Sequence, residues 1–374
     1  MSSAAVRARA ETGPIMLSLR SILLPVAFCG YLLASSPAIA AATPPSQPAS
    51  GPGGAQYAHA AVEEREAGEG ATAYTIFLPA SPRPAEAPVV VFTHGWGATD
   101  PGTYRGWIDH IVRRGNIVIF PRYQNNLRTP TADFTPNAVA AVKNALSRLS
   151  SDVFGIKPRL DRVAYLGHSV GGLLAANLAA LAAREGLPPP RAVMCTEPGK
   201  TTGPERARVA LADLGSIPAG TLLLAIAGDA DRMVGDGDAR RIFAETTNIR
   251  PADKNFILMR SDDHGTPPLV ADHRAPTAPS GEAGRAPERQ GPFGGRLRER
   301  LEARRNADER SSSPRTGPDA LDWYGTWKLF DALTDAAFYG RNRQYALGNT
   351  GEQRFMGVWS DGQPVRDLAV TLAP

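Results

Sequence analysis

Residues 163–184, which read VAYLGHSVGGLLAANLAALAAR, decide the fold of this chain. The apolar run at their start predicts a short buried strand. The run of alanine and leucine after Val170 predicts a helix that is apolar nearly all round and therefore buried. Between them, Gly167-His168-Ser169-Val170-Gly171 fits the pattern G-x-S-x-G. Glycines two residues before and two after Ser169 permit a sharp turn and a close approach of strand and helix, so we expect a strained turn that presents the Ser169 hydroxyl at the carboxyl end of a sheet.

Short apolar runs alternate with helical patterns on both sides of this unit. Several of the runs are continuously apolar, which is typical of parallel strands covered on both faces. The alternation predicts a single α/β domain with a doubly wound, mostly parallel sheet. The expected strands are Ala73–Leu78, Val89–Thr93, Ile117–Phe120, Val163–Leu166, Ala192–Cys195, Leu222–Ala227 and Phe256–Met259. The expected helices are Tyr104–Arg114, one that begins with Thr135 as its N-cap, Val170–Arg184, and one from Leu321 to before Gly340.

Residues 1–40 carry the features of a secretory signal peptide. An apolar run from Ile22 to Ala34 follows a positive residue, and Ala38-Ile39-Ala40 is a small-x-small cleavage signal. The run is too short to span a bilayer comfortably. We therefore expect cleavage after Ala40, export to the periplasm or the exterior, and no stable membrane span afterwards, with a retained anchor as the alternative. Met16 is an alternative start to Met1.

Two further segments lack the apolar side chains that a core needs. Residues 41–56 are rich in Pro, Ala, Ser and Gly and predict a flexible leader. Residues 274–318 are rich in Pro, Gly, Arg, Glu and Ser and predict a disordered charged insertion. The folded domain is therefore expected to comprise residues 57–273 and 319–374.

The charge balance and the cysteines exclude several classes of protein. The formal net charge is +4, but residues 1–40 contribute +2 and residues 274–318 contribute +4, so the remainder is close to −2. We expect no nucleic-acid surface on the folded part. Cys29 lies in the expected signal peptide, which leaves Cys195, in an apolar run, as a buried thiol without a disulfide partner. No His, Cys and carboxylate residues have metal-ligand spacing, so neither a metal nor another cofactor is expected.

A second motif, His94-Gly95-Trp96-Gly97, follows the apolar run Val89–Thr93. A loop after a buried strand can aim a backbone N–H at a site where an oxyanion forms. The second donor would be the N–H of Val170, directly after Ser169. We predict Trp96 as the loop donor, with Gly97 as the alternative, and expect His94 to hold the loop.

The turn at Ser169 and the His-Gly loop resemble those of the α/β-hydrolase superfamily. The resemblance covers most of residues 57–340 and implies an acid and a histidine further along the chain, in the order Ser, Asp or Glu, His. Residues 228–234, GDADRMV, follow an expected strand and are similar to the family pattern Gly-x-x-Asp-x-x-Val. The resemblance thus implies Asp231 as the acid that orients the histidine, with Asp229 as the alternative.

The same resemblance places the base shortly after the last expected strand, which ends at Met259. His264 lies five residues after that end. His273 is the alternative, but it lies beside the expected disordered insertion, a poor support for a side chain whose position must be held closely. We therefore predict His264 as the base that takes the proton from Ser169.

Only 26 residues, rich in Pro and Gly, separate Cys195 from Leu222, where many members of the superfamily insert a helical cap. We expect no large cap domain and an open site. The combined features predict an exported serine hydrolase that cleaves a carboxylic ester, or a related acyl bond, through an acyl-enzyme on Ser169. The ester could belong to a small molecule, a lipid or a polymer. Thioesterase, peptidase and acyltransferase activity stay open, as does a non-catalytic binding protein of the same fold.

Overall fold

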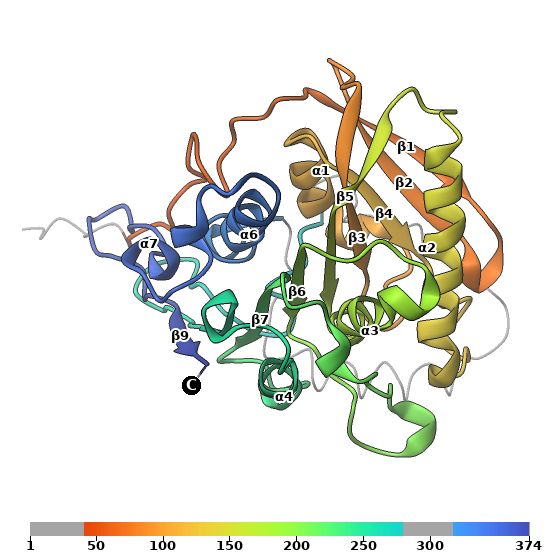
Figure 1. Ribbon diagram of the computed structural model, residues 1–374. Helices are drawn as coiled ribbons and strands as arrows, with labels where there is room; N and C mark the ends of the chain where they lie inside the picture. Colours follow the sequence, from red (N-terminus) through yellow and green to blue (C-terminus); the bar gives the residue numbers. More distant parts are fainter. Residues whose placement is uncertain (1–40, 280–316, 374) are drawn as a thin grey trace, which may run out of the picture. The chain divides into compact units, whose positions relative to one another are not determined.

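A nine-stranded sheet runs through the part of the chain that the computed structural model describes, residues 41–279 and 317–373 (Figure 1). The strand order is β1-β2-β4-β3-β5-β6-β7-β8-β9. Strands β3 to β8 run parallel to one another, whereas β2 runs antiparallel to both β1 and β4, and β9 runs antiparallel to β8. The strands are β1 Ala61–Ala67, β2 Tyr74–Ala80, β3 Glu86–Thr93, β4 Ile117–Pro121, β5 Lys157–His168, β6 Ala192–Thr196, β7 Leu222–Gly228, β8 Lys254–Met259 and β9 Ala369–Leu372.

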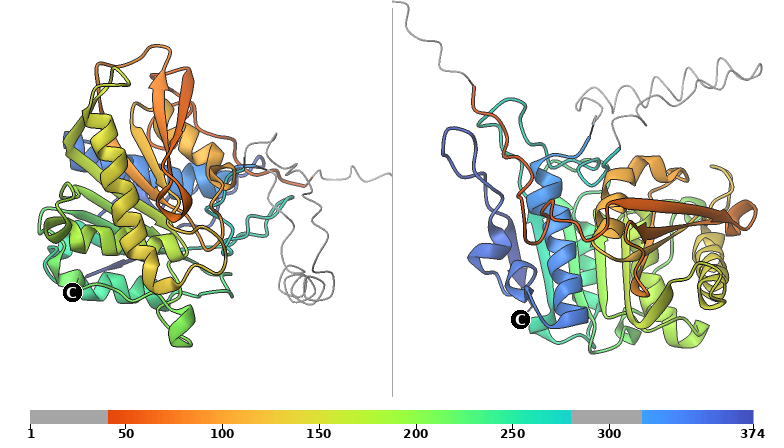
Figure 2. Two further views of the ribbon diagram at one scale, coloured as in Figure 1. Left: turned by 90° about the vertical axis from the view of Figure 1, so that its right-hand side faces the viewer. Right: turned by 90° about the horizontal axis from the view of Figure 1, so that it is seen from above.

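Helices cover both faces of the sheet (Figures 1 and 2). Along β3, Val89 and Val91 face one apolar layer, whereas Val90 and Phe92 face the other, because successive side chains of a strand point to opposite faces. The first layer contains buried residues of α2 Phe134–Ser150, α3 Val170–Glu185 and α4 Gly237–Glu245. The second contains those of α1 Arg105–Arg113 and α6 Trp327–Tyr339.

The remaining helical segments are short. A π-helical turn, Leu321–Thr326, leads into α6, and α7 spans Gly351–Arg354. The 3-10 helices are Gly70–Thr72, Pro101–Tyr104, Thr131–Asp133, Glu205–Ala207, Leu214–Ser216, Pro251–Asp253 and Arg343–Tyr345.

The predicted fold class is confirmed, and each of the seven expected strands is present. The two strands that the sequence analysis did not specify, β1 and β9, lie at the edges of the sheet. The β1 sequence AVEEREA is largely charged and is not buried, so it lacks the apolar pattern that indicates a strand. No helix within the described residues is long and apolar enough to cross a membrane. Cys195 is buried as expected, and burial raises the pKa of its thiol to about 12.

The prediction of a flexible leader at residues 41–56 is wrong. The carbonyl oxygen of Ala42 accepts a hydrogen bond from the Thr266 N–H at 2.7 Å, and the Ala42 side chain is buried. Further along, the Gly53 N–H donates to the Asp331 carboxylate at 2.7 Å. Composition did not reveal this, because the segment is held largely through its backbone, which needs no apolar side chains.

The predicted boundaries of the charged insertion also need correction. Residues 280–316 lie outside the described residues, as do residues 1–40 with the expected signal peptide. Residues 274–279, however, belong to the folded domain. Ala275 and Ala278 are fully buried, and the backbone of Ala278 bonds both to Gly106 N at 2.7 Å and to Thr103 O at 3.1 Å. The fold therefore continues past residue 273 and ties this segment to the start of α1.

Asp331 joins three parts of the second layer. Besides the Gly53 N–H, its Oδ2 contacts His110 Nε2 at 2.8 Å and Arg114 Nε at 3.2 Å, and its side chain is 4% exposed. Burial opposes ionisation of this carboxyl, but the His110 and Arg114 side chains and these hydrogen bonds together hold its pKa below the ordinary value. The charged carboxylate is thus a stabilising link between the N-terminal segment, α1 and α6.

We predict that Asp331→Asn lowers the free energy of unfolding at pH 7 by about 3–5 kcal/mol, because it breaks a buried ion pair. Since the folded pKa is depressed, the difference between parent and variant should be complete above the unfolded pKa of about 3.9 and should vanish as the pH falls through the folded value. Urea unfolding at several pH values measures it. The exposed Asp236, paired with Arg240 at 2.7 Å, provides the control Asp236→Asn, expected to cost under about 1 kcal/mol.

Candidate active site

The site is built on the turn between β5 and α3. Ser169 has φ 57° and ψ −127°, a conformation that is strained for a residue with a side chain. Its N–H donates to Thr196 O at 3.0 Å, and its carbonyl accepts from Gly172 N at 2.9 Å. A Cβ on Gly167 would lie 2.0 Å from Gly171 O. One on Gly171 would lie 2.1 Å from Thr93 O, so only glycine fits at either position. The strained turn expected from the sequence is present.

The Ser169 hydroxyl faces a histidine and, through it, a carboxylate. His273 Nε2 lies 2.9 Å from Ser169 Oγ, and His273 Nδ1 lies 2.8 Å from Asp231 Oδ2. Asp231 follows the end of β7, as expected. Its second oxygen, Oδ1, accepts the N–H groups of Met233 at 2.9 Å and Val234 at 3.1 Å. Both carboxylate oxygens therefore have partners, which fixes the carboxylate against the imidazole.

The same contacts determine the charge of Asp231. Burial opposes its ionisation, but the hydrogen bond and the attraction from His273, with the two backbone amides, hold its pKa below the ordinary value. Asp231 is therefore a carboxylate near neutral pH, able to accept the Nδ1–H of His273. That hydrogen bond leaves Nε2 of the neutral ring as an acceptor for the Ser169 proton.

The prediction of His264 as the base does not fit this geometry. The His264 ring bonds to Asp361 Oδ2 at 2.7 Å, and its side chain is 39% exposed. The chain after β8 doubles back through a bridge between Asp262 and Leu269, and Ala230 N then donates to Ala271 O at 3.0 Å. This pairing brings His273 to the end of β7. The apolar residues Leu269, Ala271, Ala275 and Ala278, all buried, were the signal in the sequence for an ordered segment.

The loop after β3 lies against the nucleophile. A Cβ on Gly95 would lie 3.3 Å from Ser169 Cβ, so glycine permits this approach. The Gly95 N–H donates to the Tyr104 hydroxyl and the Gly97 N–H to Gln124 Oε1, each at 2.9 Å. Within residues 41–279 and 317–373, the Trp96 N–H has no hydrogen-bond acceptor. This leaves Trp96, rather than the alternative Gly97, as the available donor of the loop, while Val170 is the first residue of α3.

Comparison with known proteins agrees with this architecture. Residues 90–226 match the family model described as alpha/beta hydrolase fold. That range contains the His-Gly loop, the strained turn at Ser169 and the strands around them.

The chain has an α/β-hydrolase fold.

Among solved structures, this chain is similar to a double mutant of the esterase rPPE, with 17% sequence identity and a TM-score of 0.42. The match covers 53% of this chain and 72% of that one. No curated protein sequence matches the chain.

His94 holds the loop after β3, as the sequence analysis expected. Its ring stacks on Tyr123 with a centroid distance of 4.1 Å, and its Nε2 lies 2.9 Å from Arg122 O. Burial lowers the pKa of His94 to about 4, so the ring is neutral at pH 7. The Trp96 ring packs edge-on against Phe134 of α2, which fixes the next part of the same loop.

His168 links three parts of the site. The ring is buried, and burial together with repulsion from His273 lowers its pKa to about 3. The neutral ring must donate its Nε2–H to the His273 carbonyl oxygen at 2.9 Å, which leaves Nδ1 to accept from the Tyr104 hydroxyl at 2.9 Å. Tyr104 in turn accepts the Gly95 N–H. One chain of hydrogen bonds therefore connects the loop after β3, the turn at Ser169 and the loop of His273.

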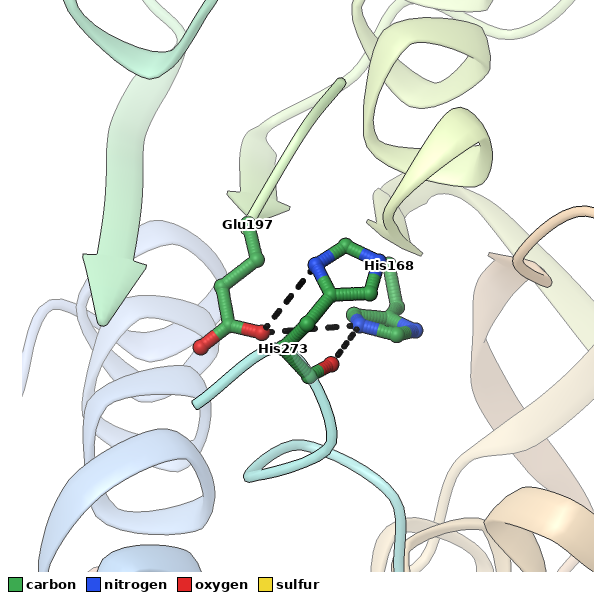
Figure 3. A group of neighbouring side chains, drawn as sticks. All are labelled: His168, Glu197 and His273. Carbon is green, nitrogen blue, oxygen red and sulfur yellow. Dashed lines mark hydrogen bonds and ion pairs between the residues drawn. The ribbon is translucent and has the colours of Figure 1, made fainter. Parts of the chain in front are cut away.

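Glu197 is a third buried group beside His168 and His273 (Figure 3). The ligand atoms of the three side chains lie within 4.8 Å of one another, so they could in principle hold a metal ion. Sequence spacing gave no sign of this cluster, because its members come from three distant segments. However, both ring nitrogens of His168 and both of His273 already take part in hydrogen bonds. The donor set therefore suits proton transfer better than metal binding.

We predict that Gly171→Ala lowers the free energy of unfolding by at least about 3 kcal/mol or abolishes soluble expression, because the new Cβ would meet the Thr93 backbone. Thermal and urea unfolding measure the effect. Gly220→Ala is the matched control. Its Cβ would meet nothing within 4 Å, so a change within about 1 kcal/mol is expected. Equal stability of the two variants would contradict the close approach of β3 and α3.

Proposed function

We propose that this α/β hydrolase is a serine hydrolase that cleaves a carboxylic ester through a covalent acyl-enzyme on Ser169. The observation that carries the proposal is the line of hydrogen bonds from Ser169 Oγ through the His273 ring to Asp231, with distances of 2.9 and 2.8 Å. A serine on a strained turn, beside a histidine oriented by a carboxylate, is the arrangement that activates a hydroxyl as a nucleophile.

In the proposed reaction, Ser169 Oγ attacks the ester carbonyl carbon while His273 Nε2 takes the hydroxyl proton. The carbonyl electrons move to oxygen, and the N–H groups of Trp96 and Val170 stabilise the resulting oxyanion. The C–O bond to the leaving group then breaks, and His273 returns the proton to the departing alkoxide. Water repeats the sequence on the acyl-enzyme and releases the acid. Asp231 holds the His273 ring throughout and stabilises its cation.

The connection in which many members of the superfamily insert a helical cap is short in this chain. Between β6 and β7, the described chain forms only two 3-10 helices, Glu205–Ala207 and Leu214–Ser216, so no helical cap lies in that connection. Such a site suits an ester with a bulky acyl or alcohol part. Thioesterase, peptidase and acyltransferase activities use the same groups and are the alternative outcomes of a substrate panel. A non-catalytic binding protein would have no need for the strained backbone of Ser169.

We also propose that the hydrolase is exported. The apolar run from Ile22 to Ala34 and the small-x-small sequence 38–40 support this proposal. Sequencing the N-terminus of protein recovered from the periplasm or medium tests it. A start at Ala41 is expected, and retention of the full-length chain in the cytoplasm would refute it.

We predict that Ser169→Ala lowers turnover of an activated aryl ester at least about a thousandfold, because the nucleophile is lost while the fold is kept. The variant should also fail to react with a fluorophosphonate probe that labels the parent. Circular dichroism and thermal unfolding provide the check that the variant is folded. A folded variant with more than a few per cent of the parent activity would remove Ser169 from the mechanism.

The two histidines after β8 should respond differently to replacement. We predict that His273→Ala loses about a thousandfold or more in kcat, whereas His264→Ala loses less than threefold, because only the His273 ring bonds to Ser169. His264 lies on the same connection and serves as the matched control. Steady-state rates with one aryl ester measure both, and the reverse ranking would show that the base is His264.

A further inference from the structure

Tyr104 carries a buried hydroxyl that the proposed reaction does not use. The residue ends the 3-10 helix before α1, and its side chain is 1% exposed. Its ring packs in the second apolar layer against Phe92 and Phe120, with centroid distances of 5.0 and 6.3 Å. Burial raises the pKa of this hydroxyl well above its ordinary value, so the proton stays on it at neutral pH. A buried hydroxyl destabilises the fold unless it is hydrogen-bonded, so this group depends on its partners.

The Tyr104 hydroxyl takes part in two hydrogen bonds of defined direction. It accepts the Gly95 N–H at 2.9 Å, and it lies 2.9 Å from His168 Nδ1. Because His168 Nε2 faces the carbonyl oxygen of His273, Nε2 must carry the hydrogen of the neutral ring (Figure 3). His168 Nδ1 is therefore an acceptor, and the Tyr104 O–H donates to it.

Gly95 brings these groups close to the nucleophile. A Cβ at this position would lie 3.1 Å from the Tyr104 hydroxyl oxygen, 3.3 Å from Ser169 Cβ and 3.4 Å from His168 Nδ1. The next residue along the chain is Trp96, whose N–H is the proposed oxyanion donor. The hydrogen bond to Tyr104 therefore fixes the backbone one residue before that donor.

The chain around Tyr104 also anchors the segment that carries His273. Ala278 N donates to Thr103 O at 3.1 Å, and Gly106 N donates to Ala278 O at 2.7 Å. Residues on both sides of Tyr104 thus hold the segment five residues after His273, while the Tyr104 hydroxyl reaches the His273 carbonyl through one imidazole ring. The loop after β3 and the segment of the proposed base therefore meet at Tyr104.

We propose that Tyr104 is a positioning residue for the reaction proposed above, and that its hydroxyl fixes the loop of Trp96 relative to the loop of His273. No bond to Tyr104 forms or breaks, and no proton leaves it. It acts by keeping the oxyanion donor and the base at the separation that the tetrahedral intermediate requires, because a displacement of about 1 Å can cost about a hundredfold in rate. This inference rests on the proposed function.

The variant Tyr104→Phe tests the inference, because it removes only the hydroxyl. An oxyanion forms both when Ser169 is acylated and when the acyl-enzyme is hydrolysed, so kcat should fall whichever step is slower. With an aryl ester, we expect kcat to fall about tenfold to a hundredfold and KM to stay within about twofold. A trifluoromethyl ketone, which forms an oxyanion on Ser169, should bind more weakly by a similar factor.

Tyr165→Phe is the matched control. Tyr165 lies on β5, its side chain is fully buried, and its hydroxyl donates to Pro188 O at 2.9 Å. Both variants should lower the melting temperature, because each loses a hydrogen bond of a buried side chain. Only Tyr104→Phe should lose kcat and affinity for the ketone. Equal losses in the two variants would overturn the inference, as would a folded Tyr104→Phe protein that matches the parent in both measurements.

A second measurement covers the case in which Tyr104→Phe does not fold. NMR of the His168 ring nitrogens in the parent protein, with isotope-labelled histidine, reports which nitrogen carries the hydrogen. We expect the hydrogen on Nε2, with Nδ1 as the acceptor of the Tyr104 hydroxyl. A hydrogen on Nδ1 would break the chain of hydrogen bonds and overturn the inference. If this chain is present but the parent shows no Ser169-dependent ester hydrolysis, the proposed function itself fails, and the two failures are thereby distinguished.

Discussion

The close approach of α3 to the neighbouring strands is the constraint on which the rest of the structure depends. Gly167 and Gly171 bring the helix within backbone contact of β3, so that Ser169 must adopt a strained conformation above the end of β5. The Thr93 hydroxyl donates to Gly171 O at 2.7 Å and secures the approach. The strained backbone of Ser169 destabilises the fold. Burial of α3 along most of its length in the apolar layer offsets this cost.

From this turn, the site is assembled by backbone hydrogen bonds more than by side-chain packing. The Ser169 N–H is held by β6, the Asp231 carboxylate by two amides, and the His273 carbonyl by the His168 ring. Such a site is preorganised, which reduces the reorganisation needed when charge develops during a reaction.

The sequence was sufficient for the features that depend on local patterns. Continuous apolar runs predicted the central strands, and glycine spacing predicted the turn at Ser169. The GDADRMV stretch implied Asp231, whose amide partners are only two and three residues away. His273 was named only as the alternative to His264, and Glu197 was not predicted, because the contacts that define them join segments 104 and 76 residues distant from their partners Ser169 and His273. The order of residues 41–56 was not predicted, because backbone hydrogen bonds hold this segment and such bonds do not depend on amino-acid composition.

The double backbone attachment of Ala278 to Thr103 and Gly106 has a consequence for how this region can change in evolution. Ala278 lies five residues after His273 and before residue 280. Its two backbone hydrogen bonds therefore hold the position of His273 independently of the length of the chain that follows. Segments of very different size could be inserted or removed beyond this anchor without displacing His273. The position is therefore a natural junction at which a lineage, or a protein engineer, could graft new sequence onto an unchanged site.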